Sequence, residues 1–309
     1  MSQVDQGEVP KLPRRDPRGH KGTFGTVVVV GGCATEGKRM IGAPALCAAA
    51  ALRSGCGLTK LVVPAPIMNS ALVICPSATG VPIPVDGRGE MLGSEAAEVL
   101  DVQFGSAQAI VVGPGLGSGE SVQSVALRCV QQEECPVIVD ADAINALAEV
   151  PELWRDFKAA AVLTPHPGEF SRLANALNVD ADPVKEESRP AAAAALAQRL
   201  GCIVVLKGSG TVVSDGQRTW VNATGGSMLA TAGTGDVLGG LIAGLAAQYV
   251  SLGRRRSPAR PLDLFDAARI AVHAHGLAGE RWASQAKAEA GLLAMELADL
   301  LPAVLATLH

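Results

Sequence analysis

The sequence predicts an α/β fold in which a mostly parallel central sheet carries helices on both faces. Short apolar runs with the length of buried strands recur along the chain, and helical segments separate most of them. Strands that are joined through helices normally run parallel, and a parallel sheet has both faces covered. The predicted strands are residues 26–30, 58–63, 109–112, 137–140, 161–163 and 203–207.

The segments that follow residue 207 change in character. Residues 211–221 contain two short strand-like stretches joined through Asp215 and Gly216, which is typical of a hairpin. The first nineteen residues contain three prolines, so we expect a flexible arm at 1–19 and a single domain at 20–309. Three helices are expected near the end of the chain, at about 235–249, 262–282 and 292–307.

The composition fits a protein with a large and tightly packed core. Hydrophobic residues make up 48% of the 309 residues and aromatic residues only 3%, while glycine occurs 35 times. The core should therefore be aliphatic and depend on the close approach of small residues. The seven cysteines show no Cys-x-x-Cys spacing, which favours reduced core thiols over a zinc site or a disulfide framework.

Charge and hydropathy argue against two classes of partner. The formal net charge of −4 disfavours general nucleic-acid binding, and we interpret the three arginines at 254–256 as part of a solvated loop. The longest apolar run, residues 41–52, is too short to cross a membrane, and the first residues lack the apolar core of a signal peptide. We therefore expect a cytoplasmic protein without membrane partners. Its alanine-rich helices suit a homo-oligomer, with a tetramer favoured.

The most informative motif is Gly-Thr-Gly-Asp at residues 233–236. It leads into an apolar helix, so its glycines should form a turn whose backbone N–H groups, together with the helix dipole, attract a phosphate. A carboxylate beside a phosphate is repelled unless it takes a proton from an attacking hydroxyl. This predicts Asp236 as the base of a phosphotransfer reaction. The alternative is that Asp236 only caps the helix.

Two other strand ends carry polar residues. The stretch from Lys207 to Thr211 offers a cation, two glycines and two hydroxyls, which suits binding of a nucleotide phosphate. The alternative is that Lys207 simply extends into water. Asp140 and Asp142 follow another strand, and one of them is expected to cap the next helix. Asp140 could instead help to order a magnesium-water cluster, although the metal ligands stay unassigned.

Three of the five histidines are considered as site residues. His166 lies in Thr-Pro-His-Pro-Gly-Glu at 164–169, after a predicted strand and before a helix that begins near Gly168. The prolines fix its direction, and ligands of open α/β sheets bind at this edge, so His166 is predicted to be exposed toward a ligand. His273 and His275 stand two apart on a helix and thus on nearly opposite faces, and we interpret both as structural.

Four motifs occur together in one order along the chain. They are residues 20–32, 111–117, 164–169 and 233–236. In this combination the chain resembles the NAD(P)H-hydrate dehydratases, a carbohydrate-kinase-like branch of the ribokinase-like superfamily. The resemblance extends from His20 to about Leu301 and implies a three-layer α/β/α sandwich.

The resemblance also implies an activity. It is the ADP-dependent dehydration of the S-epimer of hydrated NADH or NADPH, with ATP as the alternative co-substrate and Mg²⁺ as the metal ion. The products would be NAD(P)H, phosphate and AMP, or ADP where ATP is used. Two alternatives stay open: a ribokinase-like kinase of a vitamin-precursor alcohol, and a non-catalytic adenine-nucleotide sensor.

Site residues follow from the same resemblance. The implied catalytic residues are Asp236, Gly235 and Gly233. The residues implied to contact the adenine nucleotide are Lys207, Gly208, Ser209, Gly210, Thr211 and Gly235. The residues implied to contact the hydrated dinucleotide are Ala43, Gly115, Gly117, His166 and Asp236.

Two positions depart from the pattern of the relatives. They usually carry Asn where this chain has Gly226, and Gly where it has Ala232. The first difference removes a side-chain donor near the phosphates, and the second adds a methyl group where the backbone approaches the ligand. Both differences could lower activity, while the predicted base Asp236 is present.

Overall fold

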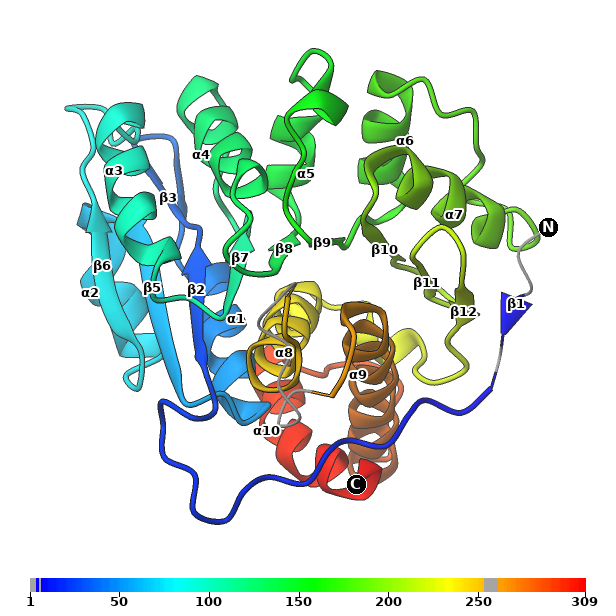
Figure 1. Ribbon diagram of the computed structural model, residues 1–309. Coiled ribbons are helices and arrows are strands. Elements are labelled where there is room, and N and C mark those ends of the chain that lie inside the picture. Colours follow the sequence, from blue (N-terminus) through cyan, green and yellow to red (C-terminus); the bar gives the residue numbers. More distant parts are fainter. Residues whose placement is uncertain (1–3, 6, 253–260) are drawn as a thin grey trace.

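The computed structural model describes residues 4–5, 7–252 and 261–309, so the arginines at 254–256 lie outside the described residues. Within these residues ten strands form one sheet (Figure 1). β11 runs antiparallel to β10 and β12, and the other neighbouring pairs are parallel. Across the sheet the strands are β1 (Val4–Asp5), β12 (Thr219–Val221), β11 (Val212–Ser214), β10 (Ile203–Leu206), β9 (Ala161–Leu163), β8 (Val137–Val139), β7 (Ala109–Val112), β2 (Thr26–Val30), β5 (Leu58–Pro64) and β6 (Thr79–Ile83).

The predicted strands agree closely with the structure. All six are present, and their ends differ from the prediction by at most one residue. The hairpin is confirmed as β11 and β12, with Ser214 opposite Thr219. The sequence analysis missed β6, whose Gly80 and Pro82 hide the strand pattern but are tolerated at a sheet edge. It also missed a small separate hairpin of β3 (Cys33–Thr35) and β4 (Lys38–Met40).

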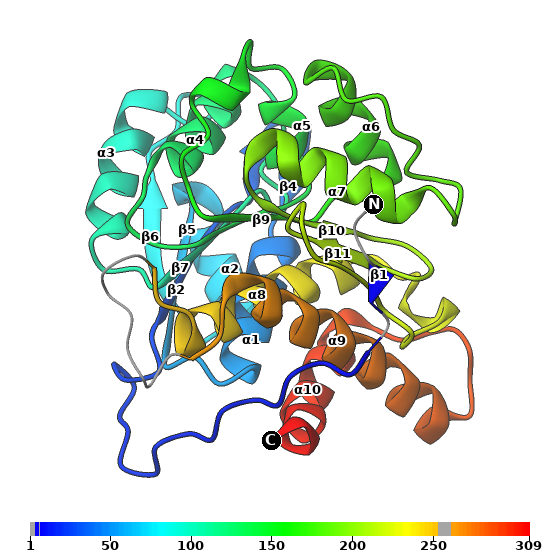
Figure 2. The same cartoon turned by 45° about the vertical axis from the view of Figure 1, so that its right-hand side comes forward.

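Helices cover both faces of the sheet and complete three layers (Figure 2). Successive residues of β2 point to opposite layers, because side chains alternate along a strand: Val27 and Val29 join one core and Val28 and Val30 the other. The first layer holds α1 (Gly42–Arg53), α2 (Met68–Ile74), α8 (Thr234–Tyr249), α9 (Leu264–Ala286) and α10 (Ala294–Leu305). The second holds α3 (Gly93–Phe104), α4 (Glu120–Gln131), α5 (Asp142–Leu147), α6 (Pro167–Ala176) and α7 (Arg189–Leu200).

The helices α1 and α8 pack unusually closely. A methyl group built on Gly240 would fall on the carbonyl oxygen of Cys47, and one built on Gly244 would fall on the hydroxyl of Ser54. Both glycines are buried, because α8 packs against α1 on one side and against the sheet on another. The small residues predicted from the composition thus bring α8 close to α1, and this contact positions the first turn of α8.

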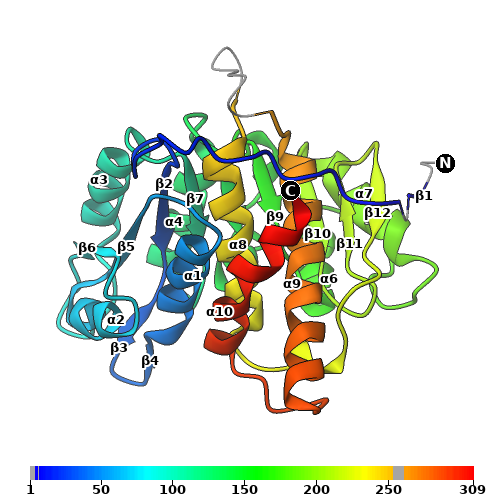
Figure 3. The same cartoon turned by 90° about the horizontal axis from the view of Figure 1, so that it is seen from below.

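The segment at residues 7–19 lies along the ends of α8, α9 and α10 (Figure 3). The side chain of Leu12 is buried, and its backbone N–H donates to the carbonyl of Leu308 at 2.7 Å. Near one end, the indole N–H of Trp220 donates to the carbonyl of Gly7, and near the other Arg15 donates to the carbonyl of Gly55. The expected arm therefore contacts the domain near both of its ends and at Leu12.

Two further expectations concern the whole chain. All seven cysteines are buried and free, as their spacing predicted. No helix among the described residues is long and apolar enough to cross a membrane.

Substitution of Gly240 tests the contact between α1 and α8. Gly240→Ala should destabilise the fold by about 1–3 kcal/mol or more, because the added methyl group forces two packed helices apart. Gly93→Ala is the matched control, since Gly93 is also helical but has nothing within 4 Å of the new methyl group. Urea unfolding of both variants measures the difference, and equal stabilities would contradict the packing described here.

Candidate active site

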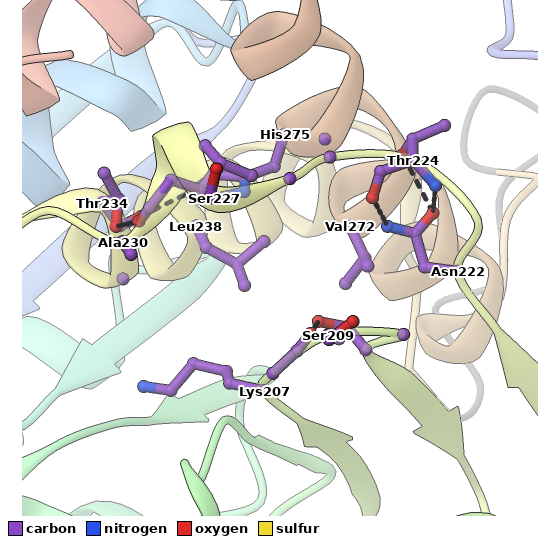
Figure 4. A pocket seen from close by; sticks show the side chains of 18 of the residues that line it. Lys207, Ser209, Asn222, Thr224, Ser227, Ala230, Thr234, Leu238, Val272 and His275 are labelled. Carbon is purple, nitrogen blue, oxygen red and sulfur yellow. Dashed lines mark hydrogen bonds between the residues drawn. The ribbon is translucent and has the colours of Figure 1, made fainter. Parts of the chain in front are cut away.

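A cavity of about 690 Å³ opens at the carboxyl end of β10. One wall is the loop at 207–211. The facing wall is formed by residues 222–227, 229 and 230, the start of α8, and α9. Figure 4 shows Lys207 and Ser209 on the first wall and Thr224 and His275 across the cavity. The residues predicted to contact a nucleotide all line it: Lys207, Gly208, Ser209, Gly210, Thr211 and Gly235.

The first turn of α8 borders this cavity. Its N-cap is Gly233 in the left-handed region with φ of 90°, and a methyl group there would lie 2.8 Å from the Cβ of Ala294. Only glycine fits such a position without strain. The hydroxyl of Thr234 donates to the carbonyls of Leu229 and Thr231, which fixes the preceding segment. Within the described residues no protein group accepts a hydrogen bond from the N–H of Gly235, so this N–H is available to an anion.

The carboxyl group of Asp236 is half-buried in the same turn. Burial raises its pKa to about 7, and the nearby negative charges of Asp140 and Asp142 act in the same direction, while Lys207 opposes them. A general base works best when its pKa lies near the working pH. The alternative that Asp236 serves as the helix cap does not hold, because the N-cap is Gly233 and makes no side-chain bond.

The ammonium group of Lys207 lies against two buried carboxylates. Its Nζ is 2.8 Å from Oδ1 of Asp140 and 3.9 Å from Oε2 of Glu169. Burial alone would lower the pKa of Lys207, but these carboxylates outweigh burial and raise it. The alternative in which Lys207 extends freely into water is therefore wrong, since its side chain is only 21% exposed.

Asp140 connects the ends of three adjacent strands. The same Oδ1 atom that accepts from Lys207 also accepts from the hydroxyl of Thr164 at 2.6 Å. Asp142 accepts instead from the N–H of Gly117 at 2.8 Å. The expectation that one of these aspartates caps α5 is wrong, because the N-cap residue is Ala141 and no side chain caps the helix.

His166 lies at the carboxyl end of β9 with its side chain 51% exposed, as predicted. The sequence analysis did not foresee that it caps α6. Its Nδ1 accepts from the N–H groups of Gly168 and Glu169, and its Nε2 lies 3.2 Å from Oε1 of Glu169. The imidazole thus carries its proton on Nε2. Glu169 is buried, accepts from the N–H of His166, and has its pKa raised by burial.

The sequence contained a signal for this role of Glu169. A carboxylate three residues after a helix cap is the pattern of a capping box. His166 hid the pattern, because histidine is not among the usual capping residues.

The residues implied to contact the dinucleotide do not line the cavity. A methyl group built on Gly115 would lie 3.3 Å from the Cβ of Ala43, so the loop after β7 lies against the start of α1. Ala43, Gly115 and Gly117 therefore form a second group of site residues outside the cavity. The charge of Asp142, which binds Gly117, acts on Asp236.

His275 is a site residue that the sequence did not reveal. It lines the cavity, and its Nε2 lies 2.9 Å from the carbonyl oxygen of Thr234, so it ties α9 to the first turn of α8. Burial lowers its pKa to about 4, which keeps the ring neutral near pH 7. This contact is compatible with the structural role predicted for His275. Nothing in the sequence, however, distinguished His275 from His273.

The fold and this site define a ribokinase-like α/β protein with the features of a phosphate-binding site. The model of a family described as NAD(P)H-hydrate dehydratase matches residues 27–303. The chain belongs to this family, and the assignment made from its motifs is confirmed.

Relatives of two lengths match the chain. It is 35% identical over 301 residues to a bifunctional NAD(P)H-hydrate repair enzyme of Moorella thermoacetica, a match that covers 97% of this chain and 52% of that protein. It is also 35% identical to the ADP-dependent (S)-NAD(P)H-hydrate dehydratase of Bacillus subtilis, with 95% and 93% covered. The chain thus spans about half the length of the bifunctional relatives and nearly all of the shorter one.

A solved structure supports the fold. The ADP/ATP-dependent NAD(P)H-hydrate dehydratase from Bacillus subtilis, co-crystallized with ATP and Mg²⁺, superposes with a TM-score of 0.73 and 31% identity, covering 97% of this chain and 99% of that one. The predicted ribokinase-like three-layer fold is confirmed.

Replacement of Asp236 by Asn should stabilise the fold at alkaline pH. Because the folded-state pKa is raised, the stabilising contribution of this carboxyl group is complete below the unfolded value of 3.8 and is lost as the pH rises through about 7. Asn carries no charge to desolvate. Asp236→Asn should therefore exceed the parent by on the order of 2 kcal/mol at about pH 8.5 and match it near pH 4. Urea unfolding at both pH values measures this, and a pH-independent difference would contradict it.

Proposed function

We propose that this protein dehydrates the S-epimer of hydrated NADH or NADPH at the expense of ADP. The observation that carries the proposal is a carboxyl group, Asp236, whose pKa of about 7 suits a base and which follows a glycine turn at the edge of a nucleotide-sized cavity. The relatives from Bacillus subtilis and Xanthomonas campestris named ADP-dependent (S)-NAD(P)H-hydrate dehydratases support ADP, and ATP is the alternative.

The proposed reaction has two steps. The hydrated nicotinamide ring carries a hydroxyl that is a poor leaving group. Asp236 takes the hydroxyl proton while the oxygen attacks the terminal phosphorus of ADP, so a phosphate ester forms and AMP leaves. The carbon–oxygen bond then breaks, phosphate departs with the bonding pair, and loss of a proton from the ring regenerates NAD(P)H. The N–H groups of Gly233 and Gly235 would stabilise the charge on the transferred phosphoryl group.

The two groups of site residues suit two ligands. The loop at 207–211 and Gly235 would bind the adenine nucleotide in the cavity they line. Ala43, Gly115, Gly117 and His166 would bind the hydrated dinucleotide. A methyl group built on Gly235 would lie 3.6 Å from Nζ of Lys207. The lysine charge is therefore close to the anion-binding turn.

The residues present fit a hydrated Mg²⁺ ion. Within the described residues no group of three His, Cys, Asp or Glu could hold a metal directly. Mg²⁺, however, commonly keeps several waters and uses one or two carboxylates together with nucleotide phosphates. Asp140, whose negative charge also acts on Asp236, would hold the ion through its waters. When bound, it would neutralise negative charge on the phosphates.

Location and assembly are also proposals. The modest net charge of −4 and the alanine-rich helices suit a homo-oligomer, with a tetramer favoured, and we place the protein in the cytoplasm. Val73 and Ile74 on α2 are exposed apolar side chains that a second subunit could cover.

The activity is tested with hydrated NADH and ADP. The parent should restore the near-ultraviolet absorbance of NADH and release one AMP and one phosphate per turnover. Asp236→Asn should fold and bind ADP but turn over roughly 10² times more slowly or worse, as expected for loss of a positioned base. A stable phosphorylated product would indicate a kinase of another alcohol, and turnover by Asp236→Asn within a few-fold of the parent would exclude Asp236 as the base.

Restoring the residue usual among relatives at Gly226 should tighten nucleotide binding. Gly226 lines the cavity in an extended conformation that any residue adopts, and a side chain there would meet only the flexible end of Met228. The amide of Gly226→Asn could donate to a phosphate oxygen, a contact worth roughly 1.5–3 kcal/mol.

The matched control is Ala232→Gly. Ala232 is exposed and does not line the cavity, so this change should alter binding little. Calorimetric titration of ADP measures both variants. Unchanged affinity in Gly226→Asn would show that residue 226 does not face the phosphates. ADP binding without turnover in the parent and in this variant would favour the nucleotide sensor.

A further inference from the structure

Arg189 is a buried cation directly behind the loop at 207–211. It is only 5% exposed, and it is the first residue of α7. Its guanidinium donates to the carbonyl of Pro183 at 3.0 Å and to those of Leu206 and Lys207 at 2.9 and 3.3 Å. The side chain therefore binds the backbone on both sides of the point where β10 becomes the loop.

The guanidinium also lies against the loop itself. A methyl group built on Gly208 would be 3.0 Å from both terminal nitrogens of Arg189, so only the absence of a side chain lets the backbone rest there. Gly208 is exposed on its other side and lines the cavity. The loop thus separates a buried positive charge from the proposed nucleotide site by the thickness of one backbone.

No carboxylate neutralises this charge. Among the described residues Arg189 forms no ion pair, and its buried Nε has no hydrogen-bond partner. Burial lowers the pKa of Arg189, and the charge of the exposed Glu186 opposes this shift without forming an ion pair with Arg189. A buried guanidinium is normally paired. The carbonyl groups that accept hydrogen bonds from Arg189 offset part of its desolvation cost, but they do not neutralise its positive charge.

The lysine of the loop is in the opposite situation. Lys207 is already paired with Asp140 and close to Glu169, so much of its charge is offset before any ligand arrives. Arg189, in contact with the same loop, carries a positive charge that no ion pair among the described residues offsets. Charges that are not screened by water act over several ångströms, and an anion across the loop would feel this one.

We propose that Arg189 is a positioning residue for the nucleotide: it holds the 207–211 loop by its carbonyls and supplies, through that loop, positive charge that attracts the phosphates of ADP. This inference rests on the proposed nucleotide site. It predicts that Arg189 contributes more to the binding affinity as the negative charge of the ligand increases. A role confined to holding the loop would not show this dependence.

The test compares ligands of increasing charge. Calorimetric affinities for adenosine, AMP and ADP are measured for the parent, Arg189→Met and Arg189→Lys. Arg189→Met should weaken ADP binding about tenfold, AMP binding less, and adenosine binding by no more than about twofold. Arg189→Lys keeps the charge and should stay within about threefold of the parent for ADP.

Arg199→Met is the matched control. Arg199 is on the same helix and also donates to a carbonyl, that of Leu177, away from the cavity. It should leave all three affinities unchanged. Turnover adds a second readout: Arg189→Met should raise the KM for ADP and leave the KM for hydrated NADH unchanged.

Each outcome decides the proposal. Equal weakening of all three ligands, in Arg189→Met or in Arg189→Lys, would overturn it and leave Arg189 a merely structural residue. If Arg189→Met does not fold, Arg189→Lys decides by itself, because loss of ADP binding despite a retained charge would also overturn it. A parent that binds none of the ligands would overturn the nucleotide site and this inference together, whereas normal binding by every variant would overturn only the role of Arg189.

Discussion

The carboxylate of Asp140 is the contact on which the site depends. It is almost fully buried at the end of β8, and it accepts hydrogen bonds from Thr164 at the end of β9 and Lys207 at the end of β10. Such a charge is tolerated away from water only when it is paired and hydrogen-bonded. The pairing fixes three neighbouring strand ends in one polar cluster, and the loops that follow them begin from defined positions.

The same charge shapes the chemistry of the first turn of α8. Burial disfavours the charged form of Asp236, the charges of Asp140 and Asp142 act in the same direction, and Lys207 opposes them. The balance leaves a carboxyl group that gains and loses a proton near pH 7. The cluster that joins the ends of these three strands therefore also sets the pKa of the proposed base. Substitution of Lys207 would affect both the strand ends and this pKa.

The position of Asp236 depends on close packing as much as on charge. Gly240 and Gly244 let α8 approach α1, and Gly233 lets the chain turn tightly beside α10 before the helix begins. His275 then joins the turn to α9 through the carbonyl of Thr234. Larger side chains at the glycines would move the carboxyl group away from Asp140, and so these distant contacts belong to the site.

The sequence by itself determined six parallel strands, the hairpin after them, the last three helices, the family and the loop that lines the cavity. Buried parallel strands form continuous apolar runs, and the glycine motifs are local. Tertiary structure alone decided which charges meet. Lys207, Glu169 and Asp140 are far apart in sequence and come together only because their strands are neighbours in the sheet. The capping role of His166, the contact of His275 and the unpaired charge of Arg189 depend likewise on partners that folding brings near, and no local pattern records them.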